Sequence, residues 1–195
     1  VGSEQDLLSE RYLGFVTNSL TLAGIAAVVT VIAANVIGAW QRLRPGRAAT
    51  GAMYVARLGY AVPGGVIAVG LLVPFAAFDN ALDAFMESTF GIDTGLLFTG
   101  SIWLLVAAYM IRFLAAAIGA YEGGIAAVSP NMDAAARVLG QSAIGVLRRV
   151  HVPILTPSLL TAALIVFVDV MKELPATLIM RPFNFDTLAV QAHRL

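Results

Sequence analysis

Residues 12–40, YLGFVTNSLTLAGIAAVVTVIAANVIGAW, contain no charged side chain. A helix needs about 20 apolar residues to cross the hydrocarbon core of a bilayer, so this stretch is long enough to span it with some tilt. The whole chain of 195 residues is 59% hydrophobic and 12% charged, whereas a soluble domain carries about 25% charged residues. So little charge cannot cover the surface of a soluble globule of this size. Length and composition therefore predict a membrane protein.

Three further stretches predict membrane spans, at residues 58–78, 94–118 and 157–174. The first of them contains Pro63 followed by two glycines, which indicates a kink or a helix start, tolerated in lipid only where neighbouring helices cover the freed backbone. The second contains Arg112, whose side chain is expected to snorkel to the cytoplasmic face. Gly and Ala recur in all the stretches, and small residues let helix backbones approach closely in lipid. The expected fold is all-α, a polytopic transmembrane helix bundle.

Charged residues between these stretches predict the orientation of the chain. Arginines concentrate in residues 42–47, after the first span, and in residues 137–149, after the third. Cytoplasmic loops carry an excess of Lys and Arg, so both regions are expected on the cytoplasmic side and the amino-terminal end outside. The opposite loops are expected to be acidic. Their acids are Glu4, Asp6 and Glu10 before the first span, and Asp79, Asp83, Glu87 and Asp93 between the second and the third.

The cytoplasmic loop, about residues 119–153, contains the segment MDAAARVLGQSAIGVLRRVHVP at residues 132–153. Ahead of it, Ser129 suits a helix N-cap and Pro130 suits the first helical position. Gly140 marks a natural helix stop. A second short helix is expected to follow and to end at Pro153, before the next span. The loop therefore predicts two short helices joined at a glycine, which another protein can grip.

The same residues resemble the loop signature of bacterial binding-protein-dependent ABC transporter permeases. That signature reads EAA, three residues, G, nine residues, I-x-L-P, and its spacing fits from Ala134 through Gly140 to Pro153 without a gap. Ala134 stands where the signature has glutamate, with Asp133 one position earlier, and valine replaces both isoleucine and leucine. The resemblance implies loop helices that dock into a groove on a cytoplasmic ATPase. The coupling residues that it implies are Asp133, Ala134, Ala135, Ala136, Gly140, Val150 and Pro153.

Residues 167–195, FVDVMKELPATLIMRPFNFDTLAVQAHRL, resemble the ferric-iron permeases and their near relatives for thiamine and similar solutes. In that branch two permease halves are often fused in one chain, and residues 12–31 resemble the first span of the second half. The resemblance implies a type I ABC importer-like fold with a cytoplasmic coupling-helix loop. Residues 1–195 then form a single transmembrane domain, expected to be a fragment with its final helix after Leu195.

The resemblance implies a permease subunit of an ATP-driven importer in the bacterial inner membrane, not an enzyme, with ferric iron as the expected solute. Permeases of the same family for thiamine, polyamine or phosphonate-type solutes remain alternatives, as do a proton-driven secondary transporter and a membrane-embedded enzyme. The implied partners are an ABC ATPase dimer, a periplasmic solute-binding protein, a second permease half and the lipid bilayer. The sequence has no Walker-type phosphate loop, so we expect the partner ATPase to use the ATP and this chain to bind no cofactor. Its net charge of zero argues against a nucleic-acid partner.

Asp169, Lys172 and Glu173 lie at the far end of the fourth stretch, and helical spacing puts Asp169 one turn from the other two. Ionisable groups inside a membrane are costly and mark functional sites by default, which favours a pathway lining or gate near the external mouth. An interfacial ion pair that ends the helix at the lipid headgroups explains the same residues. No metal site is expected: cysteine is absent, His151 and His193 are far apart in sequence, and His151 is expected to be a loop residue.

Overall fold

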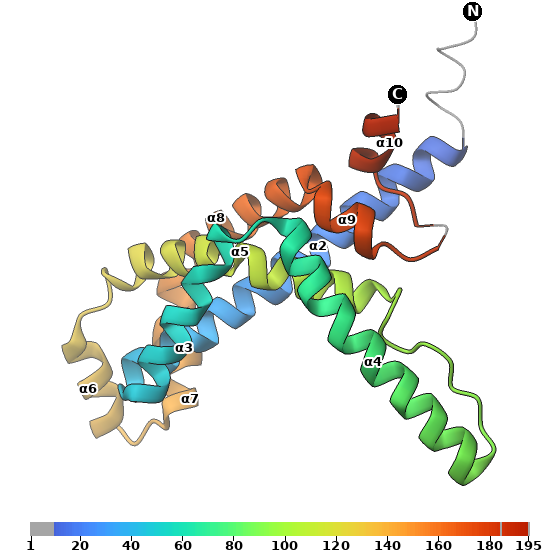
Figure 1. The fold of residues 1–195 in the computed structure, drawn as a ribbon. Helices are drawn as coiled ribbons and strands as arrows, with labels where there is room; N and C mark the ends of the chain where they lie inside the picture. Colours follow the sequence, from blue (N-terminus) through green and yellow to red (C-terminus); the bar gives the residue numbers. More distant parts are fainter. Residues whose placement is uncertain (1–9, 184, 195) are drawn as a thin grey trace, which may run out of the picture.

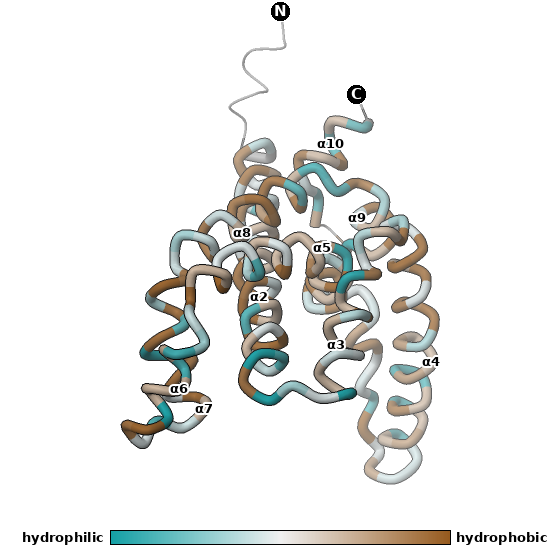
Figure 2. Tube along the Cα trace, turned by 90° about the vertical axis from the view of Figure 1, so that its left-hand side faces the viewer, coloured by the Kyte–Doolittle hydropathy of each residue, from teal (hydrophilic) through white to brown (hydrophobic). Residues whose placement is uncertain are grey.

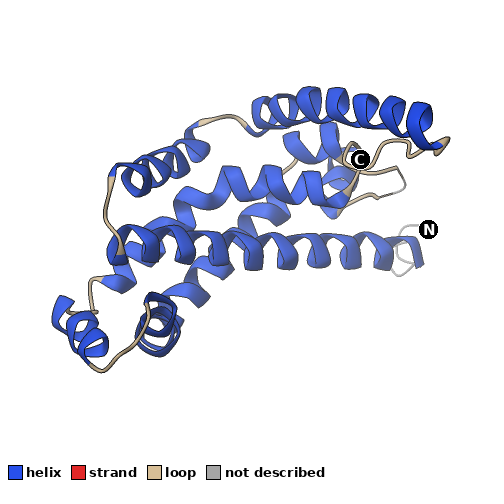
Figure 3. Ribbon diagram, turned by 90° about the horizontal axis from the view of Figure 1, so that it is seen from below, coloured by secondary structure: helices blue, strands red, loops and turns tan. Residues whose placement is uncertain are grey.

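The computed structural model describes residues 10–183 and 185–194. Within these ranges every regular element is a helix, and Figure 3 shows the helices joined by loops. Four helical stretches are long and apolar enough to cross a membrane, which confirms the predicted all-α polytopic fold. They are Tyr12–Leu43, Gly64–Phe90, Ile102–Ile125 and Ala143–Lys172.

Three long helices pack against one another as a bundle, α2 (Glu10–Leu43), α5 (Ile102–Ile125) and α8 (Val152–Lys172) (Figure 1). Small residues stand at their contacts: Ala26 of α2, Ala117 of α5 and Ala162 of α8 are each at most 1% exposed. Lipid provides no hydrophobic force between helices, so close backbone approach over such residues is what favours their association. The alanines that are frequent in the sequence therefore form the inner surfaces of the bundle.

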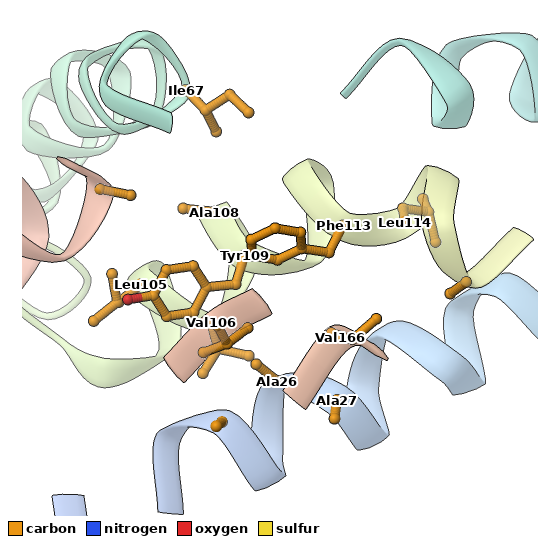
Figure 4. Close-up of a cluster of buried hydrophobic side chains, with 14 of the residues drawn as sticks. Ala26, Ala27, Ile67, Leu105, Val106, Ala108, Tyr109, Phe113, Leu114 and Val166 are labelled. Carbon is orange, nitrogen blue, oxygen red and sulfur yellow. The ribbon is translucent and has the colours of Figure 1, made fainter. Parts of the chain in front are cut away.

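The large side chains of the core come mainly from α5. Tyr109 and Phe113 lie one turn apart, with ring centroids 6.3 Å from each other, and both are nearly fully buried. Figure 4 shows them with Val106, beside Val166 of α8 and Ala26 of α2. Large residues on α5 thus face small ones on α2, which makes α5 the central element of the bundle.

The second span differs from its prediction at both ends. Residues 47–58 form a separate amphipathic helix, α3 (Arg47–Leu58), which buries one face through Ala49, Met53 and Ala56. A 3₁₀ turn, Gly59–Ala61, follows, and α4 (Gly64–Phe90) begins only after Pro63, because proline has no N–H to donate and cannot continue a preceding helix. The predicted span at residues 58–78 is therefore wrong in both limits. Beyond its first two turns α4 diverges from the bundle (Figure 1).

Three acids that were expected in an outer loop lie in α4 instead. Asp79 is fully buried and accepts a hydrogen bond of 2.7 Å from the backbone N–H of Thr99. Asp83, one turn on, accepts one of 2.8 Å from the N–H of Thr94, and Glu87 also belongs to the helix. The carboxylates of Asp79 and Asp83 thus accept hydrogen bonds from the loop that folds back along α4.

The third span also begins later than predicted, at Ile102 rather than at residue 94, and it extends past residue 118 to Ile125. The hydroxyl of Ser101 caps α5 by accepting a hydrogen bond from the N–H of Leu104 at 3.3 Å. Before it, Gly95 and Gly100 have φ values of 57° and 79°, a region that residues with a Cβ rarely adopt. These glycines keep residues 94–100 out of helix.

The fourth span begins earlier than predicted. The short helix α7 (Ala143–Val146), a π-helical turn at Leu147–His151 and α8 run on without a break. The prediction that the second loop helix ends at Pro153, before the next span, is therefore wrong. Inside the π turn the N–H of Val152 donates to the carbonyl of Leu147, five residues back, and this wider spacing admits the proline into the first turn of α8.

Two further short helices follow, α9 (Pro175–Met180) and α10 (Leu188–Arg194), neither of which was separated in the sequence. The start of α10 is fastened to α2 by a hydrogen bond of 2.8 Å from the N–H of Leu188 to the hydroxyl of Ser19. Asn18 adds a bond of 3.2 Å to the carbonyl of Asp186. The last described helix thus lies beside the beginning of α2, at the end of the bundle opposite to α7 (Figure 1).

Gly59 is a close-packed point of the fold, because a Cβ at this position would overlap the backbone carbonyl of Ile111. A backbone obstacle cannot rotate away, and overpacking of this kind costs about 1–3 kcal/mol. We expect Gly59→Ala to lower the melting temperature of the detergent-solubilised protein. Gly51→Ala, where the added Cβ meets nothing within 4 Å, is the matched control and is expected to leave it unchanged or raise it. Equal melting temperatures for the two variants would contradict this packing.

Candidate functional site

The loop that follows α5 contains α6 (Pro130–Val138) and leads into α7, at one end of the bundle (Figure 1). The hydroxyl of Ser129 caps α6 by accepting a hydrogen bond of 3.3 Å from the N–H of Asn131, with Pro130 at the start of the helix. Gly140 separates the helices with a φ of 78°. The prediction of a helix on each side of this glycine is confirmed, but the second helix runs on into α8 instead of forming a separate short helix. In Figure 2 hydrophilic residues gather at the same end, in the turn between α2 and α3.

Arg42, in the last turn of α2, joins this loop to the bundle. Its Nε lies 2.7 Å from Oδ2 of Asp133 in α6. Its terminal nitrogens donate to the carbonyls of Val128, at 2.6 Å, and of Ile125, at 3.4 Å. A planar guanidinium presents several donors in a fixed fork, so one side chain serves an acid and two carbonyls together. Arg42 therefore connects the ends of α2 and α5 to the first loop helix.

His151 completes the same cluster from the π turn. Its ring is fully buried and its Nε2 lies 2.8 Å from Oδ1 of Asp133. The expectation that His151 is a loop residue is wrong, because the helix continues through it. Both oxygens of Asp133 are thereby engaged, one by Arg42 and one by His151. We call these three residues the loop clamp.

The loop clamp keeps Asp133 ionised. Burial works to raise the pKa of this carboxyl, but the hydrogen bonds and positive charge of His151 and Arg42 outweigh it and hold the pKa below the usual 3.8. A carboxyl with a depressed pKa stabilises the folded state above its unfolded pKa, and that contribution is lost as the pH falls through the folded value. The carboxylate of Asp133 is accordingly charged throughout the neutral range.

The residues of the loop signature divide between an inner and an outer face. Asp133 and Ala136 are buried, Val150 is half-buried, and Ala134, Ala135, Gly140 and Pro153 are exposed. The outer face also carries large apolar side chains, with Val138 87%, Leu139 79% and Ile144 68% exposed. A groove of about 290 Å³ adjoins Ile144, between α7 and the end of α2. The loop and the start of α7 thus present an apolar surface at this end of the bundle.

The second predicted group, at the end of α8, does not stay together. Asp169 and Lys172 form an ion pair of 3.6 Å, in which Lys172 is 69% exposed. Glu173 turns the other way and is buried, with its Oε2 3.0 Å from Nε of Arg112 in α5. Arg112 also donates from Nη1 to the carbonyl of Val62 at 2.8 Å. The expectation that Arg112 snorkels to the cytoplasmic face is therefore wrong, because its guanidinium is bound between helices.

Residues 34–181, more than half of the chain, match the family described as "Binding-protein-dependent transport system inner membrane component". The chain belongs to this family. Its members are transport permeases rather than enzymes, and the matched residues include both charged clusters. The suspected resemblance to ABC transporter permeases is confirmed, and the permease is a multi-pass membrane protein.

Two relatives of this permease are informative. It is 26% identical over 183 residues to the Fe(3+)-transport system permease protein FbpB 2 of Haemophilus influenzae, over 92% of this chain and 32% of that protein. It is 29% identical over 133 residues to the probable ABC transporter permease protein y4fN of Sinorhizobium fredii, over 68% of this chain and 21% of that protein. The chain therefore spans about a third or less of the length of these relatives.

The contacts of three charged or polar residues of the permease were not predicted from the sequence. Arg42 follows an apolar span, where orientation alone already explains an arginine, so nothing in the sequence pointed to the clamp. His151 stands at a variable position of the signature. Arg112 did give a signal, since a single arginine inside an apolar helix usually has an internal partner, but that partner is remote in the sequence.

The loop clamp is expected to hold α6 in place. We expect Asp133→Asn and Arg42→Gln each to speed amide hydrogen exchange across residues 129–142 of the permease, because either change leaves a partly buried charge without its partner. Arg148→Gln, on the exposed face, is the control and is expected to leave exchange unchanged. In a double-mutant cycle on unfolding, Asp133 and Arg42 are expected to couple by about 0.5–3 kcal/mol. Additive effects of the two substitutions would contradict the clamp.

Proposed function

We propose that this permease is the transmembrane subunit of an ATP-driven importer and that a cytoplasmic ABC ATPase dimer drives it through the loop at residues 129–153. The observation that carries the proposal is the construction of this loop. Its inner face is fastened to the bundle through Arg42, Asp133 and His151, while its outer face presents Val138 and Leu139 almost fully to the surroundings. Exposed apolar side chains gathered on a protein surface mark sites of interaction.

The clamp explains how such a loop transmits movement. A partner that displaces α6 acts through Asp133 on Arg42 in α2 and on His151 in the helix that leads into α8. Arg42 also holds the carbonyl of Ile125, at the end of α5. One push on α6 therefore reaches the three packed helices of the bundle together. The ATP is used by the partner ATPase, and this chain needs no cofactor of its own.

The proposed cargo is ferric iron, because the relative from Haemophilus influenzae is named for Fe(3+) transport and its alignment covers 92% of this chain. A periplasmic solute-binding protein would select and deliver the cargo, as the family description indicates for the transport system. A second permease half would complete the pathway across the bacterial inner membrane. Asp169, Lys172 and Glu173 belong in this proposal to the outer half of that pathway, at the end of α8 farthest from the loop.

Charge on the outer face of the loop tests the docking directly. We expect Val138→Asp combined with Leu139→Asp to abolish co-purification of the ATPase and ATP-dependent iron uptake, while the permease still inserts into the membrane. A charge in an apolar interface has no partner and must be desolvated. Tyr54→Asp, at an exposed apolar position of α3, is the control and is expected to retain both. Iron uptake by the permease and its binding protein in the absence of any ATPase would overturn the proposal.

Gly140 provides a second, independent test. A Cβ at this position meets nothing within 4 Å, so a side chain there acts on the backbone conformation and not on packing. Because the φ of 78° disfavours β-branched residues strongly, we expect Gly140→Val to shift α6 relative to α7 and to separate ATP hydrolysis from uptake. Gly123→Ala, also in open space, serves as the control. Wild-type ratios of uptake to ATP hydrolysis in Gly140→Val would contradict the role of the hinge.

A further inference from the structure

Two helix breaks meet at one arginine inside the bundle. The first break lies before α4, where the carbonyl of Val62 accepts a hydrogen bond of 2.8 Å from Arg112. The second lies between α8 and α9, where Glu173 approaches Nε of the same arginine to 3.0 Å. A helix break inside a membrane frees backbone groups that lipid cannot hydrate. Arg112, in the unbroken helix α5, meets both breaks at once.

Glu173 is enclosed on its other sides as well. Its Oε1 accepts a hydrogen bond of 3.4 Å from the N–H of Ala176, in the first turn of α9. The same oxygen occupies the space that a Cβ of residue 64 would need, with the guanidinium of Arg112 also close by. Only glycine therefore fits at the start of α4 while Glu173 is in this position. The carboxylate links the start of α4 to the start of α9.

The contact between α4 and α9 is narrow. A Cβ at Gly65 would lie 4.0 Å from Cβ of Pro175 and 3.6 Å from the end of Ile179. Farther along, α4 diverges from the bundle (Figure 1), and its buried residues besides Asp79 all lie in its first two turns, at Gly64, Ile67 and Ala68. The start of α4 is thus held at a small area, with Glu173 and Arg112 beneath it.

A neutral side chain would hold such a contact at lower desolvation cost. Ion pairs inside a low-dielectric region gain little over apolar packing, and removing one partner is strongly unfavourable. In domain movements the backbone rotation is absorbed by a few loop or element-terminal residues, often small ones, and Gly64 and Gly65 at the start of α4 are residues of this kind. The charged pair between the start of α4 and the break after α8 therefore favours a contact that opens and closes during function over a permanent contact.

We propose that Arg112 and Glu173 form a latch that holds the break between α8 and α9 against the start of α4, and that opening of this latch is a step of transport. The inference rests on the proposed importer function and adds Arg112, Val62 and the start of α4 to the outer pathway. Asp169 and Lys172 lie outside the latch, since Lys172 is largely exposed and its ion pair within the described part of the chain is with Asp169, at 3.6 Å.

A reversible cross-link tests whether the contact moves. The chain contains no cysteine, and the 4.0 Å between the Cβ positions of residues 65 and 175 suits a disulfide, whose Cβ atoms lie about 3.5–4.5 Å apart. We expect Gly65→Cys with Pro175→Cys in the assembled transporter to form a disulfide on oxidation. Oxidation is expected to abolish uptake while the ATPase stays bound, and reduction is expected to restore it. Each single-cysteine variant is the control and should transport under both conditions.

Substitutions test the pair itself. We expect Glu173→Gln and Arg112→Gln to slow formation of the 65–175 disulfide and to allow ATP hydrolysis that is not accompanied by uptake. The uptake per ATP is expected to fall by roughly tenfold or more, in line with loss of a buried charge partner. Arg57→Gln and Glu122→Gln, which remove an ion pair between α3 and α5 that is about half exposed, are the matched controls and should resemble the wild type. A merely structural role would reduce the yield of protein without changing the ratio of uptake to hydrolysis.

The outcomes separate the latch from the importer function. Undiminished uptake by the fully cross-linked transporter would overturn the latch while leaving the ATP-driven function intact. Wild-type coupling in Glu173→Gln would do the same. Failure of the unmodified transporter to take up iron in the presence of its ATPase and binding protein would instead contradict the proposed function on which the latch rests.

Discussion

A buried backbone N–H or C=O needs a hydrogen-bond partner, above all in lipid, where no water is available, and this constraint accounts for the placement of four charged side chains. Arg42 meets the carbonyls at the end of α5, Arg112 meets the carbonyl of Val62, and Asp79 and Asp83 receive the amides of the loop beside α4. Each charge stands where a helix ends, breaks or is approached by a loop. These four charged residues are therefore hydrogen-bond partners of backbone groups at helix ends, helix breaks and loops.

Arg42 and Arg112 act at two different places along the bundle. Arg42 lies at the end next to the loop helices, where it ties α2, α5 and α6 together with Asp133 and His151. Arg112 lies within α5, where it faces the breaks that begin α4 and separate α8 from α9. The tightly packed helices α2, α5 and α8 connect these places. A displacement of the loop helices thus has a continuous, close-packed route to the breaks, which is the mechanical requirement of the proposed importer.

Sequence reasoning was most successful where a local rule sufficed. Ser129, Pro130 and Gly140 have the positions in the loop that capping and turn chemistry predict, and the spacing around them pointed to the family that residues 34–181 match. It was least successful at the limits of the spans, because hydropathy does not register a helix start after Pro63, a cap at Ser101 or a π turn that admits Pro153. Glu173 was grouped with Asp169 by helical spacing, but α8 ends just before it and the side chain turns away.

The sequence by itself determined that this chain is an all-helical membrane protein with a two-helix loop, since apolar length, capping residues and a glycine stop are local properties. Only the tertiary structure decided which charges pair. Arg42 with Asp133 and Arg112 with Glu173 are separated by long stretches of chain, and their meeting depends on how α2, α5 and α8 pack. Small residues along these helices permit many close packings in lipid, so the partner of a buried charge follows from the packing and not from its neighbours in the sequence.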